Sequence, residues 1–279
     1  MLINSGAEII YKSGFDKQIS EAFYAPIDEP MLKFGMFGLI AGTVLSTLLS
    51  LGVAGIIGVC AFIAICELAP RPFASVLLAA VRLLASIPSV VFGLIGVMLV
   101  VPSIESAFIT IDMQIEYLEF FQMTGRNLLS SVIVISFMIM PMVIALSSDA
   151  LKEAPLSLKE TGMAFGMSHI RVIWRICLPF ARPGIVAGLI LAAGRGIGEA
   201  IAVSMVCGGV GMIPILSNGM AALLTPILPL SSAIVNKSEA MSVPAVESAL
   251  FACGAILLAM GAALSATARA FMRRSARNG

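Results

Sequence analysis

The stretch that decides the fold runs from Pro155 to Val206 and has two parts. The first, PLSLKETGMAFGMSHIRVIWRICLPFARPG (residues 155–184), is polar and contains no charge-free run of membrane length. The second, GIVAGLILAAGRGIGEAIAVSMV (residues 184–206), is as long as a membrane span but carries Arg195 and Glu199 near its middle. A polar loop followed directly by a span with a charge pair inside it predicts coupling between a soluble motor and a polar cargo.

The composition of the whole chain indicates a membrane protein. Of its 279 residues 59% are hydrophobic and 12% charged, and the mean hydropathy is +1.04. Soluble domains carry about 25% charged residues, so we expect an all-α, polytopic membrane helix bundle. The net charge of +1 argues against a nucleic-acid partner. The five cysteines form no C-x-x-C pair and are expected to be buried, reduced thiols, with no metal site.

The apolar runs predict about five transmembrane helices within a domain of residues 34–274. The expected spans are residues 34–66, 76–101, 128–147, 184–206 and 246–268. Residues 149–182 form the polar loop between the third and fourth spans. Residues 1–33 are a polar segment without the pattern of a secretory signal, and residues 275–279 are a basic tail.

Residues 208–247 are apolar enough to suggest a sixth span. Pro214, Pro226 and Pro229 argue against a continuous helix there, so we expect short helices packed against the outer ends of the bundle. The distribution of Lys and Arg supports this prediction. With the 149–182 loop and the C-terminus inside, eleven basic residues lie inside and five outside, as the positive-inside rule requires. The prediction is a multi-pass protein of the cell (inner or plasma) membrane, with its N-terminus outside and its C-terminus in the cytoplasm.

Small residues and one proline predict local features of the first two spans. Gly38, Gly42, Ser46 and Ser50 follow one another at steps of four, which predicts a stripe where a neighbouring helix approaches closely. Pro88 predicts a kink in the second span, and in lipid the freed carbonyl needs other protein or a water-filled cavity to satisfy it. A kink that lines a pathway and a static kink both fit the sequence.

Arg195 and Glu199 are the residues best suited to act on a solute. Arg195 follows Gly184 by about 17 Å of helix, which predicts a place near the bilayer midplane. Burying an arginine there costs at least ~2.5 kcal/mol, so such residues usually face a pathway, and a guanidinium fork suits a tetrahedral oxyanion. Glu199 lies four residues later and is expected to share the helix face and pair with Arg195. The alternative is a purely structural ion pair.

The sequence offers no catalytic site. It contains no phosphate-cradling G-x-x-x-x-G-K-[ST] loop, and the lone histidine, His169, has no cysteine or second histidine near it and is expected at the surface. We therefore expect that the chain is not an enzyme and carries no cofactor or metal of its own.

The polar loop resembles that of the membrane subunits of bacterial ABC importers. Their loop reads E-A-A, three residues, G, nine residues, I-x-L-P. Glu160, Gly166, Ile176, Leu178 and Pro179 match this spacing, while the first triplet departs from it and ends in Gly162. IPSVVFGLIG (residues 87–96) and GRGIGEAIAV (residues 194–203) resemble permease subunits of phosphate importers of the PstC type.

This resemblance implies an ABC importer permease fold with a cytoplasmic coupling helix that begins near Pro155. It implies four partners: a sister permease, a dimer of cytosolic ATPases that bind ATP and Mg, an extracytoplasmic phosphate-binding protein and membrane lipid. The family normally has one more helix before residue 34, so the resemblance predicts either a chain shorter by a helix or a start codon placed too far downstream. A permease for sulfate, molybdate or phosphonate, and a proton-coupled secondary transporter that uses Arg195 and Glu199 as a relay, are the alternatives.

Overall fold

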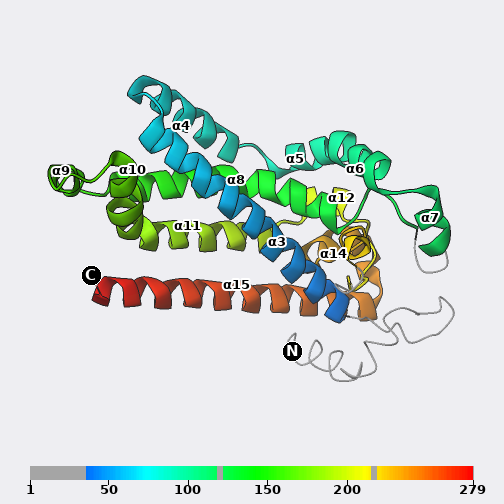
Figure 1. Ribbon diagram of the computed structural model, residues 1–279. Coiled ribbons are helices and arrows are strands. Elements are labelled where there is room, and N and C mark those ends of the chain that lie inside the picture. The colour runs from blue at the N-terminus through cyan, green and yellow to red at the C-terminus, as the bar shows by residue number, and fades with distance from the viewer. Residues whose placement is uncertain (1–35, 118–121, 215–218, 279) are drawn as a thin grey trace. The chain divides into compact units, whose positions relative to one another are not determined.

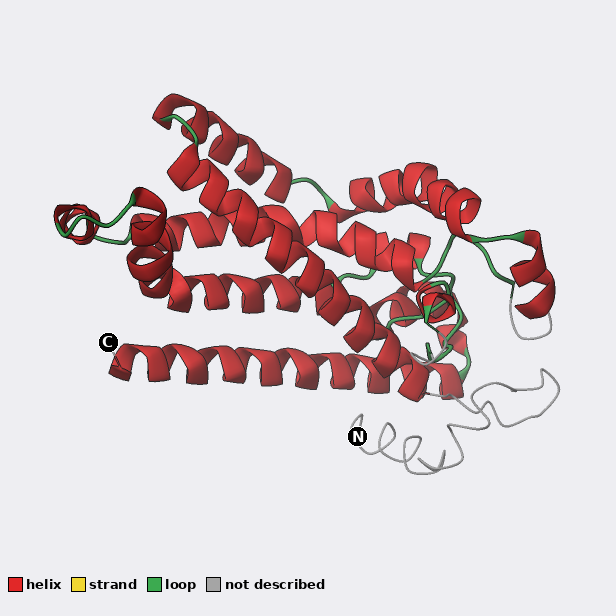
Figure 2. Cartoon of the chain, in the orientation of Figure 1, coloured by secondary structure: helices red, strands yellow, loops and turns green. Residues whose placement is uncertain are grey.

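The computed structural model describes residues 36–117, 122–214 and 219–278 (Figure 1). The predicted N-terminal segment, residues 1–33, lies outside the described residues. Across the described ranges the secondary structure is helical, apart from an isolated bridge between Gly208 and Ile227 (Figure 2). Five helices in these ranges are long and apolar enough to cross a membrane, which confirms the predicted all-α membrane bundle. They are Met36–Leu68, Ser89–Phe108, Leu128–Lys152, His169–Gly198 and Val246–Phe271.

Several of these spans join an α-helix to a π-helical turn, labelled η. The elements in chain order are α3 (Met36–Ile63), η1 (Ala64–Leu68), α4 (Arg71–Ala85), α5 (Ser89–Ile95), η2 (Gly96–Val100), α6 (Val101–Phe108), α7 (Ile111–Tyr117), α8 (Leu128–Lys152), α9 (Leu156–Ala164), α10 (His169–Val172), η3 (Ile173–Cys177), α11 (Leu178–Gly198), α12 (Ile201–Val206), α13 (Met220–Leu223), α14 (Leu230–Lys237), the 3-10 helix η5 (Ser238–Ser242) and α15 (Pro244–Asn278).

The chain divides into two compact units, each assembled from three segments of sequence. Unit 1 consists of Met1–Ser50, Pro88–Ile135 and Ile197–Gly261, and unit 2 of Leu51–Ile87, Ser136–Gly196 and Ala262–Gly279. Unit 2 has a core of apolar side chains from the first span, α4, α8 and the helix that starts at His169. The buried members are Phe62, Leu78, Ile144, Leu151, Val172, Cys177, Ala181 and Ile185.

The second span begins later than the sequence predicts. Residues 76–101 were expected to form one kinked helix, but α4 ends at Ala85 and a new helix starts at Ser89. Pro88 lies between them in an extended conformation, with φ −57° and ψ 137°. Proline cannot donate a backbone hydrogen bond and disfavours helical geometry at the preceding residue, so the helix breaks here instead of bending.

The fourth span is shifted in the opposite direction. It was expected over residues 184–206, but the helix runs from His169 to Gly198 and stops before Glu199. Hydropathy marks only the part of a helix that lies in lipid, whereas backbone hydrogen bonding continues through the charged turns that contain Arg171 and Arg175. The early end follows three glycines in five residues, which favour helix less than other residues do.

The segment after α12 forms the short helices α13 and α14, as the prolines predict, and it is buried in unit 1. Leu224, Ile227, Leu230 and Ser232 are fully buried. The backbone here is tied to the neighbouring helices, because the Leu128 N–H donates to the Thr225 carbonyl at 3.0 Å and the Leu230 N–H donates to the Thr43 hydroxyl at 2.9 Å. Irregular backbone is tolerated at membrane depth only where protein or water satisfies it in this way.

The stripe of small residues on α3 makes the close contacts that the sequence predicts. A Cβ on Gly38 would stand 2.2 Å from the Gly211 carbonyl oxygen, so the two backbones touch. Further along α3 the Ser50 hydroxyl lies 3.1 Å from the Val132 carbonyl oxygen of α8. Unit 1 therefore depends on the absence of side-chain volume at one end of the stripe and on a polar contact at the other.

The prediction that the cysteines are buried holds for three of them. Cys177, Cys207 and Cys253 are buried, Cys66 is partly buried and Cys60 is exposed on α3; all five are free thiols. Burial raises the pKa of the Cys207 thiol, which keeps this group neutral.

Gly38→Ala is expected to destabilise the protein, because the added methyl group overlaps a backbone carbonyl that cannot rotate away. Overpacking of this kind costs about 1–3 kcal/mol. Gly52→Ala on the same helix is the matched control, since nothing lies within 4 Å of a Cβ there. The measurement is the unfolding temperature of the purified protein in detergent. Equal unfolding temperatures for the two variants would contradict the close contact at Gly38.

Candidate functional site

The polar loop contains the short helix that the motif spacing predicts. Pro155 caps α9 in an extended conformation, and α9 ends where Gly166 adopts φ +75°. The Gly166 N–H donates to the Met163 carbonyl at 2.9 Å, and the Met167 N–H donates to the Gly162 carbonyl at 3.2 Å. These two bonds form a Schellman motif, which requires a left-handed residue at the position that Gly166 occupies.

Gly162, where the sequence departs from E-A-A, is the point at which α9 packs on the rest of unit 2. It is buried, and a Cβ there would meet the Ile176 Cδ1 at 2.6 Å and the Val172 Cγ2 at 3.1 Å. Ile176 lies in η3 and Val172 in α10. The structure thus brings together two of the predicted motif residues, Gly162 and Ile176, through direct contact.

The last two motif residues begin the longest helical stretch of the fourth span. Leu178 is the first residue of α11 and packs against the core of unit 2, whereas Pro179 is exposed one residue later. The end of the motif at Leu178–Pro179 is therefore inside a continuous helix. The π-helical turn η3, closed by the Leu178 N–H on the Ile173 carbonyl, precedes the proline.

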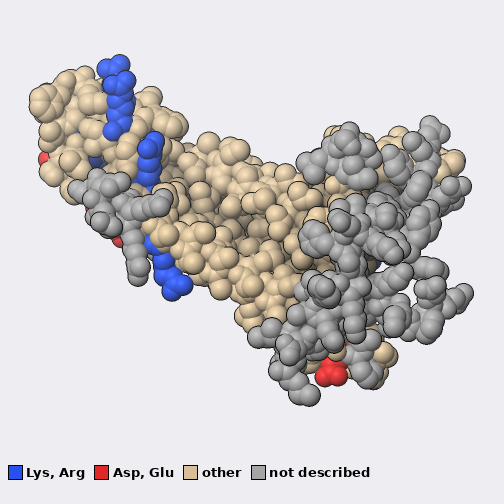
Figure 3. All heavy atoms as spheres, turned by 90° about the horizontal axis from the view of Figure 1, so that it is seen from below, with Lys and Arg blue, Asp and Glu red and all other residues tan. Residues whose placement is uncertain are grey.

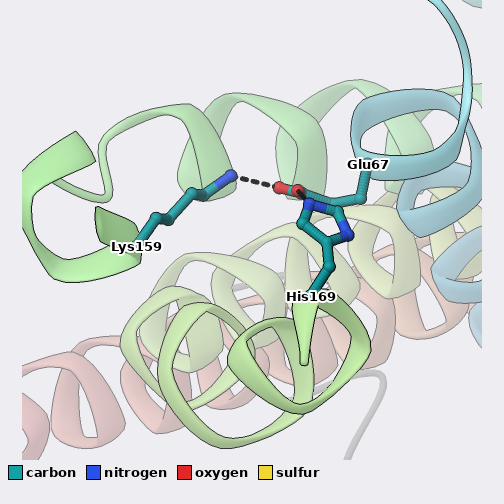
Figure 4. A network of polar contacts seen from close by, with 3 residues as sticks. All are labelled: Glu67, Lys159 and His169. Atoms are coloured by element: carbon teal, nitrogen blue, oxygen red, sulfur yellow. Dashed lines mark hydrogen bonds and ion pairs between the residues drawn. The ribbon is translucent and has the colours of Figure 1, made fainter. Parts of the chain in front are cut away.

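A buried carboxylate that the sequence analysis did not single out connects α9 to the first span. The Glu67 side chain in η1 is 5% exposed, and Lys159 of α9 donates to its Oε1. The His169 Nε2 lies 3.7 Å from the other oxygen, and the His169 side chain is 53% exposed, near the surface as predicted. Figure 4 shows both side chains pointing toward the Glu67 carboxylate. No local sequence pattern could reveal this cluster, because Glu67 and Lys159 are 92 residues apart.

The helix α9 carries side chains that unit 2 leaves uncovered. Leu156 is 70% exposed, Phe165 at the end of the helix is 83% exposed, and Glu160 between them is exposed as well. Basic residues concentrate in the same unit (Figure 3). Of the Lys and Arg with described side chains, nine belong to unit 2 (Arg71, Arg82, Lys152, Lys159, Arg171, Arg175, Arg182, Arg195 and Arg269) and two to unit 1 (Arg126 and Lys237).

Arg195 donates a hydrogen bond to a backbone carbonyl at the helix break next to Pro88. Its Nη1 donates to the Ala85 carbonyl at 3.2 Å, and Ala85 is the last residue of α4. The carbonyls at a helix end have no intrahelical partner and carry partial negative charge, so a guanidinium there is favourable. The sequence predicts that other protein or a water-filled cavity satisfies the freed carbonyl, and the partner at this break is Arg195, which is itself only partly buried.

Glu199 does not lie on the helix that carries Arg195, which corrects the prediction of a shared face. Since α11 ends at Gly198, Glu199 begins a two-residue break before α12. Its Oε1 accepts a hydrogen bond from the Ala202 N–H at 3.0 Å and so caps α12. The pairing prediction assumed a continuous helix, and the helix is interrupted between the two residues.

Two serines that were not predicted as site residues hydrogen-bond to the backbone at the break between α11 and α12. The Ser231 hydroxyl donates to the Glu199 carbonyl at 2.6 Å, and the Ser232 hydroxyl donates to the Ala200 carbonyl at 3.3 Å. Both serines are buried at the start of α14. Their signal in the sequence is a pair of hydroxyl residues shortly after Pro226 and Pro229, which argue against a continuous helix.

A family model and several known proteins match this chain over most of its length. A family model described as "Binding-protein-dependent transport system inner membrane component" matches residues 56–277. The phosphate transport system permease protein PstC of Mesorhizobium japonicum is 30% identical over 278 residues, which are 95% of this chain and 81% of that protein. The protein of the same name from Pasteurella multocida is 30% identical over 262 residues, 89% of this chain and 77% of its own length. The probable ABC transporter permease protein YqgH of Bacillus subtilis is 34% identical over 199 residues, 71% of this chain and 60% of its own length.

Gly166→Ala is expected to loosen the end of α9, because an L-residue in the left-handed region costs about 1–2 kcal/mol. The effect comes from the backbone alone, since nothing lies within 4 Å of a Cβ at this position. Gly166→Asn should be milder, because asparagine visits this region more readily. Amide hydrogen exchange over residues 162–167 measures the loosening. Exchange as slow in Gly166→Ala as in the unchanged protein would contradict the Schellman motif.

Proposed function

Because this chain belongs to the family of binding-protein-dependent transport system inner membrane components, and resembles its PstC phosphate permeases over most of its length, we propose how α9 and Arg195 serve phosphate import. The chain is the membrane permease subunit of an ABC importer for phosphate. It is a multi-pass membrane protein and is not itself catalytic. The two PstC relatives are named for phosphate transport and the family is named for binding-protein-dependent transport, so the alternatives of another oxyanion and of proton coupling are not favoured.

The exposed face of α9 is the observation that carries the proposed coupling role. Leu156 and Phe165 expose large apolar surfaces next to the charged Glu160, in a loop whose other side is anchored by Gly162. Apolar side chains exposed in this way mark an interaction site. We assign α9 to a groove on a cytosolic ATPase and place this part of unit 2 on the cytoplasmic side. ATP and Mg bind to that ATPase chain.

The remaining partners follow from the same assignment. A single permease of five spans is expected to form the phosphate path with a sister permease, over a dimer of ATPases. An extracytoplasmic phosphate-binding protein delivers the ion from the other side of the membrane.

Arg195 is proposed to meet the phosphate ion. One N–H of its guanidinium holds the Ala85 carbonyl, and the planar fork has further N–H groups to offer an oxyanion. Because the residue is only partly buried, an ion can reach it. Glu199 has a different task in this proposal: it fixes the break that follows α11 and adds a negative charge that keeps phosphate from binding too tightly.

Site-directed labelling is expected to place α9 and the C-terminus in the cytoplasm and the N-terminus outside. Single cysteines at Asn4, Ser157 and Asn278, in a background without the native cysteines, are labelled with a membrane-impermeant reagent in oriented vesicles. Positions 157 and 278 should react only from the cytoplasmic side, and position 4 only from the other. Addition of the ATPase should protect position 157 and leave 278 reactive. Labelling of 4 and 278 from one side would overturn the five-span topology, and an unprotected position 157 would overturn the docking role of α9.

Arg195→Lys is expected to lower phosphate uptake per assembled complex by roughly 10- to 100-fold, the equivalent of about 1.5–3 kcal/mol for a hydrogen bond to a charged group. Lysine keeps the charge and a donor for the Ala85 carbonyl but loses the flat fork. Arg195→Gln, which also keeps a donor, should abolish uptake. Phosphate binding by the separate binding protein should be unchanged in both.

Glu199→Gln provides the corresponding test at the second break. Glutamine retains an acceptor for the Ala202 N–H, so the cap remains while the charge is lost. Uptake should fall if the charge acts on the ion. Normal uptake by assembled Arg195→Gln and Glu199→Gln complexes would leave both residues with purely structural roles.

A further inference from the structure

We propose that the Lys159–Glu67 ion pair is the connection through which movement of α9 reaches the first membrane span. This inference rests on the proposed function, since it takes α9 as the helix that the ATPase moves. It assigns Glu67 and Lys159 as positioning residues of the transport cycle, a role separate from docking and from the ion path.

The geometry places one carboxylate at the meeting point of three elements. Glu67 lies in η1, the last turn of the Met36–Leu68 span. Lys159 reaches its Oε1 from α9, and His169, the first residue of the fourth span, lies 3.7 Å from its Oε2 (Figure 4). Displacement of α9 therefore acts on a group that belongs to the first span and also faces the start of the fourth.

The two attachments of α9 differ in physical character. The contact of Gly162 with Ile176 and Val172 is apolar and non-directional, and it includes no hydrogen bond or ion pair between side chains. The ion pair behaves differently, because the Glu67 side chain is 5% exposed and the Lys159 side chain 24% exposed. Separating these charges would leave a carboxylate uncompensated in a low-dielectric surrounding, so the two residues are expected to move together.

The first span is built to pass such a movement on. Glu67 belongs to a π-helical turn, a form of helix that is rare and often found at functional sites. One turn before it, Phe62 is fully buried in the core of unit 2, together with Val172, Cys177 and Ile185 of the fourth span. A pull on Glu67 therefore acts on the end of the first span, and the turn that precedes this end is packed in the core of unit 2.

The experiment measures phosphate uptake per ATP hydrolysed, in vesicles that contain the complete importer with its ATPase and binding protein. Glu67→Gln is expected to lower this ratio about tenfold, within the usual range of coupling between sites, while ATP hydrolysis continues. Lys159→Gln, at the more exposed partner, should give the same ratio. The double variant should be no worse than either single one, because both substitutions remove the same link.

Arg82→Gln is the matched control. It removes another ion pair of unit 2, in which the Arg82 Nη2 lies 2.6 Å from the Asp149 Oδ1 and which joins α4 to α8. Its uptake per ATP should equal that of the unchanged protein. An unchanged ratio in assembled Glu67→Gln or Lys159→Gln complexes, or additive losses in the double variant, would overturn the inference. Absence of ATP-dependent phosphate uptake in the unchanged complex would instead refute the proposed function.

Discussion

The constraint on which this structure depends is that backbone polar groups in a membrane need protein partners wherever a helix stops. Two of the breaks between helices in the described residues lie at Ser86–Pro88 and at Glu199–Ala200. The first break is satisfied by the guanidinium of Arg195 on the Ala85 carbonyl. The second is satisfied by Glu199 on the Ala202 N–H and by two serine hydroxyls on the carbonyls of the break. The positions of these charged and polar residues therefore follow from what the interrupted backbone needs.

Much of the fold follows from the sequence because apolar length and motif spacing act locally. The number of spans, the short α9 helix and the turn at Gly166 are all set by residues near one another in the chain. The predicted ends of the spans were wrong where the helix extends beyond the apolar run. An example is His169, where the helix starts in a turn that contains charged residues. The predicted pairing of Arg195 with Glu199 was wrong because Gly196 and Gly198 weaken the helix between them, and periodicity alone assumes that the helix continues.

Other parts of the site could not be predicted, since they join residues that are distant in sequence. Nothing near Glu67 indicates that Lys159 lies against it, and nothing near Ser231 indicates a broken helix beside it. The burial of the segment around Ile227 could not be predicted either, because its prolines indicate only that no continuous helix runs through it. Here the prolines occur where neighbouring hydroxyl and backbone groups replace the hydrogen bonds that a helix would have supplied.

The glycine at position 162 has a consequence for how this protein can change over evolution. An alanine at this place, as in the E-A-A triplet, would bring a methyl carbon to 2.6 Å from the Ile176 Cδ1. A lineage that acquires the alanine must therefore trim residue 176, rotate its side chain or raise the short helix away from its support. We expect the residues at 162, 172 and 176 to covary among relatives. The distance between α9 and the elements beneath it, α10 and η3, would then be set by the three positions together.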